Sequence, residues 1–392
     1  MSWLREHFEL SRGGGTHNVR SMEGLRGFAV FLVFLVHYTT FIDPWIAKPT
    51  LTRALAQTLH TIGNTGVDLF FVLSGYLIYG MLISREQPFL RFLTRRAERI
   101  YPAFLAVFLI YFVLSFLLPS HSKIPDGSFD AVLYLSENLL LLPGLFPIDP
   151  MITVAWSLSY EMFYYVAIPV VIGLVGLRQK SIAWRVSFFC AVALVTVAYC
   201  AIAGGPVRLV MFVSGILLYE TIRSGRFRAP RSSVALAALV IGLLCTLLPV
   251  GGSMGQALKM SILFASFFAL CFSCFFYPNA WLGRAFSWTP VRWLGNMSYS
   301  YYLLHGLALQ VAFLALGVFL PPIEQGFPFF FALLPLMFAL TLCPSALLFL
   351  VIERPLSLTP TQSRTSSSRL AHAAHSDAIG QDARSPSKEP IP

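Results

Sequence analysis

Long apolar stretches recur about ten times along this chain of 392 residues. Each holds about 20 residues, the length at which a helix crosses the hydrocarbon core of a bilayer. Charged residues make up only 12% of the chain, about half the share found in a soluble domain. We therefore predict an all-α polytopic membrane protein with about ten transmembrane helices. The predicted spans are roughly 24–42, 62–84, 100–119, 154–176, 182–203, 206–222, 232–250, 257–276, 293–320 and 327–352.

Lysine and arginine are distributed unevenly between the two sides that these spans define. Of the 28 basic residues, 23 fall at the chain ends and in alternate connections; the other side holds Lys48, Arg53, Lys123, Arg208 and Lys259. Basic residues accumulate on the cytoplasmic side of membrane proteins. We therefore expect both termini in the cytoplasm and an even number of spans. The net charge of +10 then reflects topology, and no nucleic-acid partner is expected.

Three regions differ in composition. Residues 1–23 are predicted to form a cytoplasmic N-terminal segment, since Arg26 interrupts the apolar run that a cleaved signal peptide requires. Residues 24–356 form the membrane domain, and 357–392, rich in Ser, Arg, Pro and Ala, are expected to be a disordered cytoplasmic tail. The apolar connection 120–153 is predicted to be an interfacial or re-entrant helix on the outer side, and the sequence leaves the choice open.

The six cysteines lie mostly inside the predicted spans. Cys271 and Cys274 share one helical face, but no histidine or acidic residue near them completes a metal site. Small apolar packing explains these residues. We expect neither disulfides nor a bound metal.

The first span carries an arginine and a histidine, Arg26 and His37. Ionisable groups at hydrocarbon depth cost roughly 2.5–3.5 kcal/mol on insertion scales and are functional candidates for that reason. Eleven residues correspond to three helical turns plus about 20°, so both side chains point to one face, about 16 Å apart. The alternative is that Arg26 reaches the cytoplasmic surface and His37 is a buried structural histidine.

Two carboxylates lie in later spans, Asp68 in "GNTGVDLFFVLSGYLI" and Glu161 in "AWSLSYEMFYYV". Counted from the outer ends of their spans, both lie at the predicted depth of His37. A histidine with carboxylates at its level is an arrangement for general-base catalysis, and equally one for proton relay in a transporter.

Further candidates lie in the second, fourth and ninth spans and just before the third. His305 is expected near mid-bilayer in "LGNMSYSYYLLHG", with Tyr299 below it, although tyrosines at the start of a span are often interfacial. Ser74 and Trp156 lie close to the predicted acids. The segment "RFLTRRAERIYP" places Arg91, Arg95 and Arg99 on one helical stripe next to Arg96. Such a stripe suits lipid head groups or a bound polyphosphate.

Taken together, the motifs resemble the acyltransferase 3 family of integral membrane O-acyltransferases, over about residues 19–356. The similar segments, in order, are "RSMEGLRGFAVFLVFLVHY", "GNTGVDLFFVLSGYLI", "RRAERIYPAF", "WSLSYEMFYY", "LGNMSYSYYLLH" and "IERP". Two positions depart from the family pattern. Glu23 stands where many members have Asp, and Glu161 is followed by Met162 where a second acid is common.

The resemblance implies acyl-CoA, usually acetyl-CoA, as a cytoplasmic donor and a sugar hydroxyl as acceptor. The partners would be a glycan or lipid-linked sugar and the lipids of the plasma membrane, the inner membrane of a bacterium. Arg26, with Arg95, Arg96 and Arg99, would bind the CoA phosphates. His37 would act as a base on the acceptor or relay the acyl group, with Asp68 and Glu161 as further catalytic candidates. Direct transfer and a covalent acyl-enzyme both remain open.

Two other classes compete with this interpretation. A proton-coupled transporter would also have ten spans with buried His, Asp and Glu residues, and would move its substrate without acyl chemistry. A non-catalytic scaffold does not account for the ionisable groups at depth. The six motifs in order favour the acyltransferase.

Overall fold

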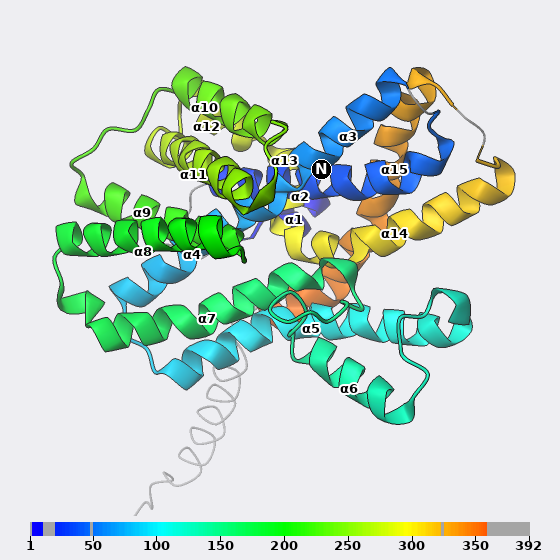
Figure 1. Cartoon of the computed structure of the whole chain (residues 1–392), viewed down its shortest axis with the longest axis horizontal. Helices are drawn as coiled ribbons and strands as arrows, with labels where there is room; N and C mark the ends of the chain where they lie inside the picture. The colour runs from blue at the N-terminus through cyan, green and yellow to red at the C-terminus, as the bar shows by residue number, and fades with distance from the viewer. Residues whose placement is uncertain (1, 11–19, 48–49, 323–324, 359–392) are drawn as a thin grey trace, which may run out of the picture.

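The computed structural model describes residues 2–10, 20–47, 50–322 and 325–358 (Figure 1). Within these ranges helices are the only extended regular elements, besides two isolated β-bridges, so the all-α prediction is confirmed. The α-helices are α1 Ser2–Phe8, α2 Arg20–Ile42, α3 Leu51–Gly63, α4 Thr65–Ser84, α5 Phe89–Leu117, α6 Ser128–Leu139, α7 Trp156–Val175, α8 Ile182–Ala203, α9 Val210–Ser224, α10 Ser232–Cys245, α11 Gly252–Phe276, α12 Trp281–Phe286, α13 Thr289–Asn296, α14 Ser298–Phe319 and α15 Phe327–Leu348. A π-helix, η6 Phe349–Leu358, follows α15 directly.

Eight helical segments in the described ranges are long and apolar enough to cross a membrane, and they confirm a multi-pass membrane protein. One of them combines α3 and α4 into 34 residues, and another combines α15 with η6. The two remaining predicted spans coincide with α9 and α10, which have 15 and 14 residues. Helices of that length measure about 22 Å, less than a hydrocarbon core of about 30 Å. The cytoplasmic placement of both termini stays a prediction.

Close helix crossings hold the centre of the bundle together. Helix α2 lies near the middle of Figure 1 and contacts α3, α4, α13 and α14. A Cβ atom at Gly27 would collide with the carbonyl of Val291, and one at Gly75 with the carbonyl of Phe212. Only glycine therefore permits α2 to approach α13, and α4 to approach α9, this closely. Such small-residue contacts are the usual way for membrane helices to associate.

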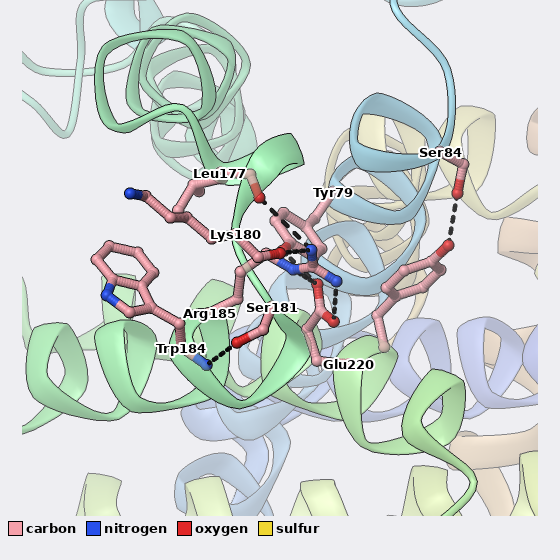
Figure 2. Close-up of polar contacts among 9 residues, drawn as sticks. Tyr79, Ser84, Leu177, Lys180, Ser181, Trp184, Arg185 and Glu220 are labelled. Carbon is pink, nitrogen blue, oxygen red and sulfur yellow. Dashed lines mark hydrogen bonds and ion pairs between the residues drawn. The ribbon is translucent and has the colours of Figure 1, made fainter.

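A buried ion pair joins α4, α8 and α9 away from this centre (Figure 2). Arg185 Nε and Nη2 donate to the two Glu220 oxygens at 2.7 and 2.8 Å, and the Tyr79 hydroxyl donates to the same carboxylate. The Arg185 Nη1 atom donates to the Lys180 carbonyl at 2.7 Å. Because each charge has several partners, the cluster satisfies its own polar groups and fastens the three helices.

The connection between α5 and α7 turns back into the bundle. Helix α6 lies beneath α5 in Figure 1, and the Tyr101 hydroxyl, from the first half of α5, donates to the Leu139 carbonyl at 3.1 Å. Met151 and Ile152 are buried, and the Met151 amide donates to the Asn138 side chain. Helix α7 therefore begins inside the bundle. The segment 120–153 therefore folds back against the bundle, and we call it the folded-back segment. The choice between an interfacial and a re-entrant helix stays a prediction.

The N-terminal segment packs against the same end of the bundle as α13 and η6. Phe8 is buried between the rings of Trp293 and Phe349. Arg292 binds Glu23 at 2.8 Å and Glu9 at 3.1 Å, which ties α1 to α2 and α13. The predicted disordered tail lies outside the described residues from position 359 onward.

Candidate active site

A cavity of about 140 Å³ lies among α2, α4, α5, α7 and α14. We name it the inner cavity, after the predicted topology. Its charged lining consists of three arginines and one carboxylate, and its hydroxyl groups come from serine and tyrosine. These polar residues are Arg26, Arg96, Arg99, Glu161, Ser74, Ser157, Ser298, Tyr165, Tyr299 and Tyr302. Five separate helices therefore bring together most of the residues that the sequence singled out.

Arg26 enters the inner cavity from the second turn of α2. Its Nε and Nη2 atoms donate to the Ser298 hydroxyl at 3.2 and 3.0 Å. Ser298 is the first residue of α14 and is buried. Helix α14 thereby fixes the direction of the Arg26 side chain, which lines the inner cavity.

Arg99 is held by a carboxylate from the end of the chain. Its Nη1 atom lies 2.7 Å from Glu353, which is completely buried in η6. Glu353 also accepts hydrogen bonds from the amide and hydroxyl groups of Ser300. The guanidinium group of Arg99 lies over the Tyr299 ring at 5.7 Å. The π-helix, a rare element found often at functional sites, thus sets the position of a cavity arginine.

The neighbouring arginines of α5 have different surroundings. Arg96 lies over the rings of Phe92 and Tyr165, at 5.6 and 5.9 Å. Arg95 is exposed, and it does not line the inner cavity. The structure therefore brings Arg96 and Arg99 to Arg26 and leaves Arg95 outside, although the sequence grouped all four.

Glu161 also belongs to the inner cavity. It accepts hydrogen bonds from the Ser74 hydroxyl at 2.9 Å and from the Tyr165 hydroxyl one helical turn away. Because α7 begins inside the bundle, Glu161, five residues past its start, lines the inner cavity with Arg26 and not the cavity that contains His37. Within the described ranges, no hydrogen bond or ion pair joins His37 to either predicted carboxylate.

His37 lines a second cavity of about 130 Å³, which we name the outer cavity. The folded-back segment supplies one wall of this cavity, and α5 and α14 supply another. Its polar residues are His37, Tyr111, Ser115, His121, Lys123, Thr153 and Gln310. Lys123 is bound to Asp149 at 3.3 Å and to the Pro150 carbonyl at 3.0 Å, so it holds the two ends of the folded-back segment together.

A thin layer of side chains separates the two cavities. The Tyr302 hydroxyl lies 2.6 Å from the Ser157 hydroxyl and 3.1 Å from the Val154 carbonyl. Tyr302 and Ser157 line the inner cavity, whereas Val154 and Leu303 line the outer one. The cavities therefore meet end to end at this layer.

His305 lies in the layer, directly behind His37. The two imidazole rings are 4.9 Å apart at 69°. His305 is completely buried, and its Nδ1 atom lies 2.9 Å from the carbonyls of Tyr301 and Tyr302. Its Nε2 atom has no hydrogen-bond partner among the residues that the structure describes.

Asp68 and Trp156 lie outside both cavities, on either side of Arg208. The Arg208 Nη1 atom is 3.7 Å from the Asp68 carboxylate, and the guanidinium group lies 5.6 Å over the Trp156 ring. Asp68 is 1% exposed. Arg208 therefore links the first turn of α4 to the start of α7. From the sequence, Arg208 was counted only among the basic residues of the outer side.

Several site residues had no role in the sequence-based prediction. Glu353 belongs to the "IERP" motif, but no role was predicted for it from the sequence. Its position at the end of an apolar span, next to Arg354, was the signal that could have identified it. Ser298 and Tyr302 belonged to a motif whose tyrosines suit an interface equally well. Nothing in the sequence singled out Lys123, because its contact with the outer cavity depends on how the segment 120–153 folds. In the described ranges, no group of three or more metal-binding side chains is found.

The fold and the two cavities define a multi-pass membrane protein with a polar site inside its helical bundle. The family model described as "Acyltransferase domain", that of acyltransferase 3, matches residues 19–348. The chain belongs to this family, as the motifs predicted, and it is an acyltransferase. No solved structure matches the chain.

Three named proteins illustrate what the chain is similar to. Acyltransferase MdmB of Streptomyces mycarofaciens is 27% identical over 380 residues, covering 86% of this chain and 90% of that protein. Putative peptidoglycan O-acetyltransferase YrhL of Bacillus subtilis is 26% identical, covering 73% of this chain and 48% of that protein. O-acetyltransferase OatA of Staphylococcus aureus is 26% identical, with coverages of 72% and 49%. The chain thus spans about half the length of the last two proteins.

Proposed function

We propose that the chain transfers an acyl group, acetyl in the first instance, from acyl-CoA to a hydroxyl group of a carbohydrate. The acceptor would be a cell-surface or exported glycan, or a lipid-linked sugar. The observation that carries this proposal is the end-to-end arrangement of an arginine-lined cavity and a histidine-lined cavity. Two of the similar proteins are named O-acetyltransferases of this type, one of them for peptidoglycan. We assign a carbohydrate acceptor to this chain by analogy with those two proteins.

Arg26, Arg96 and Arg99 support a phosphate-bearing donor. Guanidinium groups bind phosphate oxygens in pairs of parallel hydrogen bonds and stay charged at any working pH. Two of the three are oriented in advance, Arg26 by Ser298 and Arg99 by Glu353. Less side-chain freedom is then lost when a ligand binds. A cytoplasmic donor fits the predicted topology, in which the basic end of α5 faces the cytoplasm.

His37 supplies the general base in the proposed reaction. Its imidazole would accept the proton of the acceptor hydroxyl while the hydroxyl oxygen bonds to the thioester carbonyl carbon. The carbon–sulfur bond then breaks, the CoA thiolate leaves, and a proton neutralises it. His37 is half-buried at the wall of the outer cavity, where a hydroxyl can approach it.

The layer at Tyr302 defines two routes for the acyl group. Arg26 and His37 are about 16 Å apart along α2, and the hydroxyls of Tyr302 and Ser157 lie between the cavities. In direct transfer the thioester would reach through this layer. In the other route a side chain would carry the acyl group across as a covalent intermediate. Acid-stable radiolabel retained on the protein after incubation with labelled acetyl-CoA alone would identify the second route.

The main test uses purified full-length protein and radiolabelled acetyl-CoA, with an extracted surface glycan as acceptor. We expect CoA release by wild type, loss of release in both Arg26→Ala and His37→Ala, and retained acetyl-CoA binding in His37→Ala. Wild-type protein that neither binds acetyl-CoA nor releases CoA with any glycan would contradict the donor assignment. The transporter hypothesis gives way here because family membership makes the chain an acyltransferase.

The location of the protein is part of the same proposal. We place it in the plasma membrane, the inner membrane of a bacterium, with both termini in the cytoplasm. Fusions of a reporter enzyme to each terminus and to the connection 120–153 test this orientation. An active periplasmic reporter at either terminus would contradict it.

A further inference from the structure

We propose that His305 is a positioning residue that accepts a hydrogen bond from His37 and so fixes its tautomer. The Nε2 atom of His305 would be the acceptor. This inference rests on the proposed function, in which His37 is the base. It assigns to His305 a role in orienting His37, and no contact with either substrate.

The surroundings of Nδ1 define the tautomer of His305. Both groups within hydrogen-bond distance of this atom are backbone carbonyls, Tyr301 and Tyr302, each at 2.9 Å. Carbonyl oxygens only accept hydrogen bonds, so Nδ1 must carry the proton. The Nε2 atom of a neutral imidazole is then an acceptor.

That acceptor is buried without a partner. His305 has no exposed surface, and its Nε2 atom lacks a hydrogen bond. A buried polar atom left unpaired costs about 1–3 kcal/mol, so a native structure is expected to use it. The ring of His37 lies 4.9 Å away, centroid to centroid, in an edge-to-face arrangement. The N–H group of His37 is therefore the donor that we assign to Nε2 of His305.

Packing determines which ring moves. The Tyr301 ring stacks on His305 at 5.3 Å and 9°, and its hydroxyl is bound to Thr341 at 2.7 Å. His305 is thus clamped on its face and at Nδ1, whereas His37 is half-buried at a cavity wall. A rotation of the His37 ring brings its N–H toward Nε2. Catalytic hydrogen bonds are often long in a free enzyme and tighten when substrate binds.

This hydrogen bond would determine which ring nitrogen of His37 acts as the base. Once one nitrogen of His37 donates to His305, the other must be unprotonated and can face the outer cavity. An orienting third group of this kind recurs wherever a histidine activates a hydroxyl. The other titratable groups that face His37 are His60 on α3 and, across the outer cavity, Tyr111, His121 and Lys123. None of them is placed as His305 is, with a buried acceptor and a clamped ring.

Two substitutions separate positioning from packing. His305→Gln can keep an acceptor oxygen near the place of Nε2, whereas His305→Asn keeps a donor for the two carbonyls and removes that acceptor. We expect His305→Asn to lower kcat for acetyl transfer to the glycan extract by about 10- to 100-fold, with the KM for acetyl-CoA unchanged. His305→Gln should recover most of the activity. Equal losses in both folded variants, or none in His305→Asn, would overturn the proposal.

A second test reads the tautomers directly and needs no activity, and its main readout comes from the wild-type protein. Nitrogen-15 NMR of histidine-labelled protein in lipid distinguishes protonated from unprotonated ring nitrogens. We expect His305 protonated at Nδ1 only and a single His37 tautomer, which becomes a mixture in His305→Asn. A wild-type His305 protonated at Nε2 would overturn the proposal. Failure of acetyl transfer by wild type would contradict the proposed function alone, because the NMR result does not depend on it.

Discussion

The inner and outer cavities differ in how their charged groups are satisfied. In the inner cavity, Arg99 has Glu353 as its partner, and Glu161 accepts from two hydroxyls. In the outer cavity, His37 lies against a histidine whose Nε2 atom has no partner. A site whose charges are already fixed is suited to binding a charged ligand without reorganisation. A site with an unused acceptor is suited to moving a proton.

The largest effect should come from the outer cavity. His37→Ala is expected to lower acetyl transfer by about 10²- to 10⁴-fold, the usual contribution of a general base, with acetyl-CoA affinity unchanged. His60→Ala is the matched control, because His60 contacts Thr39 and Thr40 on the same side but lines neither cavity. Radiolabel transfer and equilibrium binding measure the two quantities. Equal losses of transfer in both variants would contradict a general-base role that belongs to His37 and not to His60.

The next effect concerns the ion pair of the inner cavity. Arg99→Ala leaves the buried Glu353 without its cation, and loss of one partner of a buried pair costs about 3–5 kcal/mol. We expect a lower thermal midpoint in detergent and a loss of acetyl-CoA binding. Adding Glu353→Gln to this variant should recover stability but not binding.

Arg185→Ala serves as the control for that experiment. Its partner Glu220, drawn with it in Figure 2, is equally buried. Neither residue lines the inner or the outer cavity. We expect a similar loss of stability with acetyl-CoA affinity intact in the folded fraction. If binding falls as far as in Arg99→Ala, the Arg99 result reports stability and not ligand contact.

A smaller effect compares two adjacent arginines. Arg96→Ala should weaken acetyl-CoA binding about tenfold or more, since hydrogen bonds to charged groups contribute about 1.5–3 kcal/mol. Arg95→Ala should change it less than about twofold, because Arg95 is exposed and does not line the inner cavity. Isothermal titration of the two variants under one salt condition makes the comparison. Equal effects would indicate a general electrostatic contribution of the α5 stripe.

The smallest effect is expected at the layer between the cavities. Tyr302→Phe removes a hydroxyl that contacts Ser157 and the Val154 carbonyl, at a cost of about 0.5–1.5 kcal/mol for each bond. We expect a slightly lower thermal midpoint, less than about a tenfold change in transfer, and unchanged acetyl-CoA affinity. Complete loss of transfer with stability intact would instead make the Tyr302 hydroxyl part of the reaction.

Much of the fold and part of the site could be predicted from sequence. Apolar length predicted the helices, and the eleven-residue spacing predicted that Arg26 and His37 lie on one face of α2. The structure agrees with the second point, since the two residues line cavities that meet end to end. Helical periodicity is a local property, and a continuous helix such as Arg20–Ile42 transmits it unchanged.

Depth in the bundle could not be predicted for Glu161. The estimate from sequence counted residues from the start of the fourth span, as if that start lay at the membrane surface. The folded-back segment 120–153 places the start of α7 inside the bundle, with Met151 and Ile152 already buried ahead of it. Residue counting measures depth only when a helix begins at the interface, and tertiary packing decides where it begins.

The sequence by itself determined the helical membrane architecture, the family motifs and the helical faces, because length, composition and periodicity act within single segments. Tertiary structure decided which side chains share a cavity. It joined Arg99 to Glu353 across 254 positions, excluded Arg95 beside Arg96, and set His305 behind His37. Helix tilt, rotation and crossing arise from contacts between segments far apart in the chain, and no local pattern contains them.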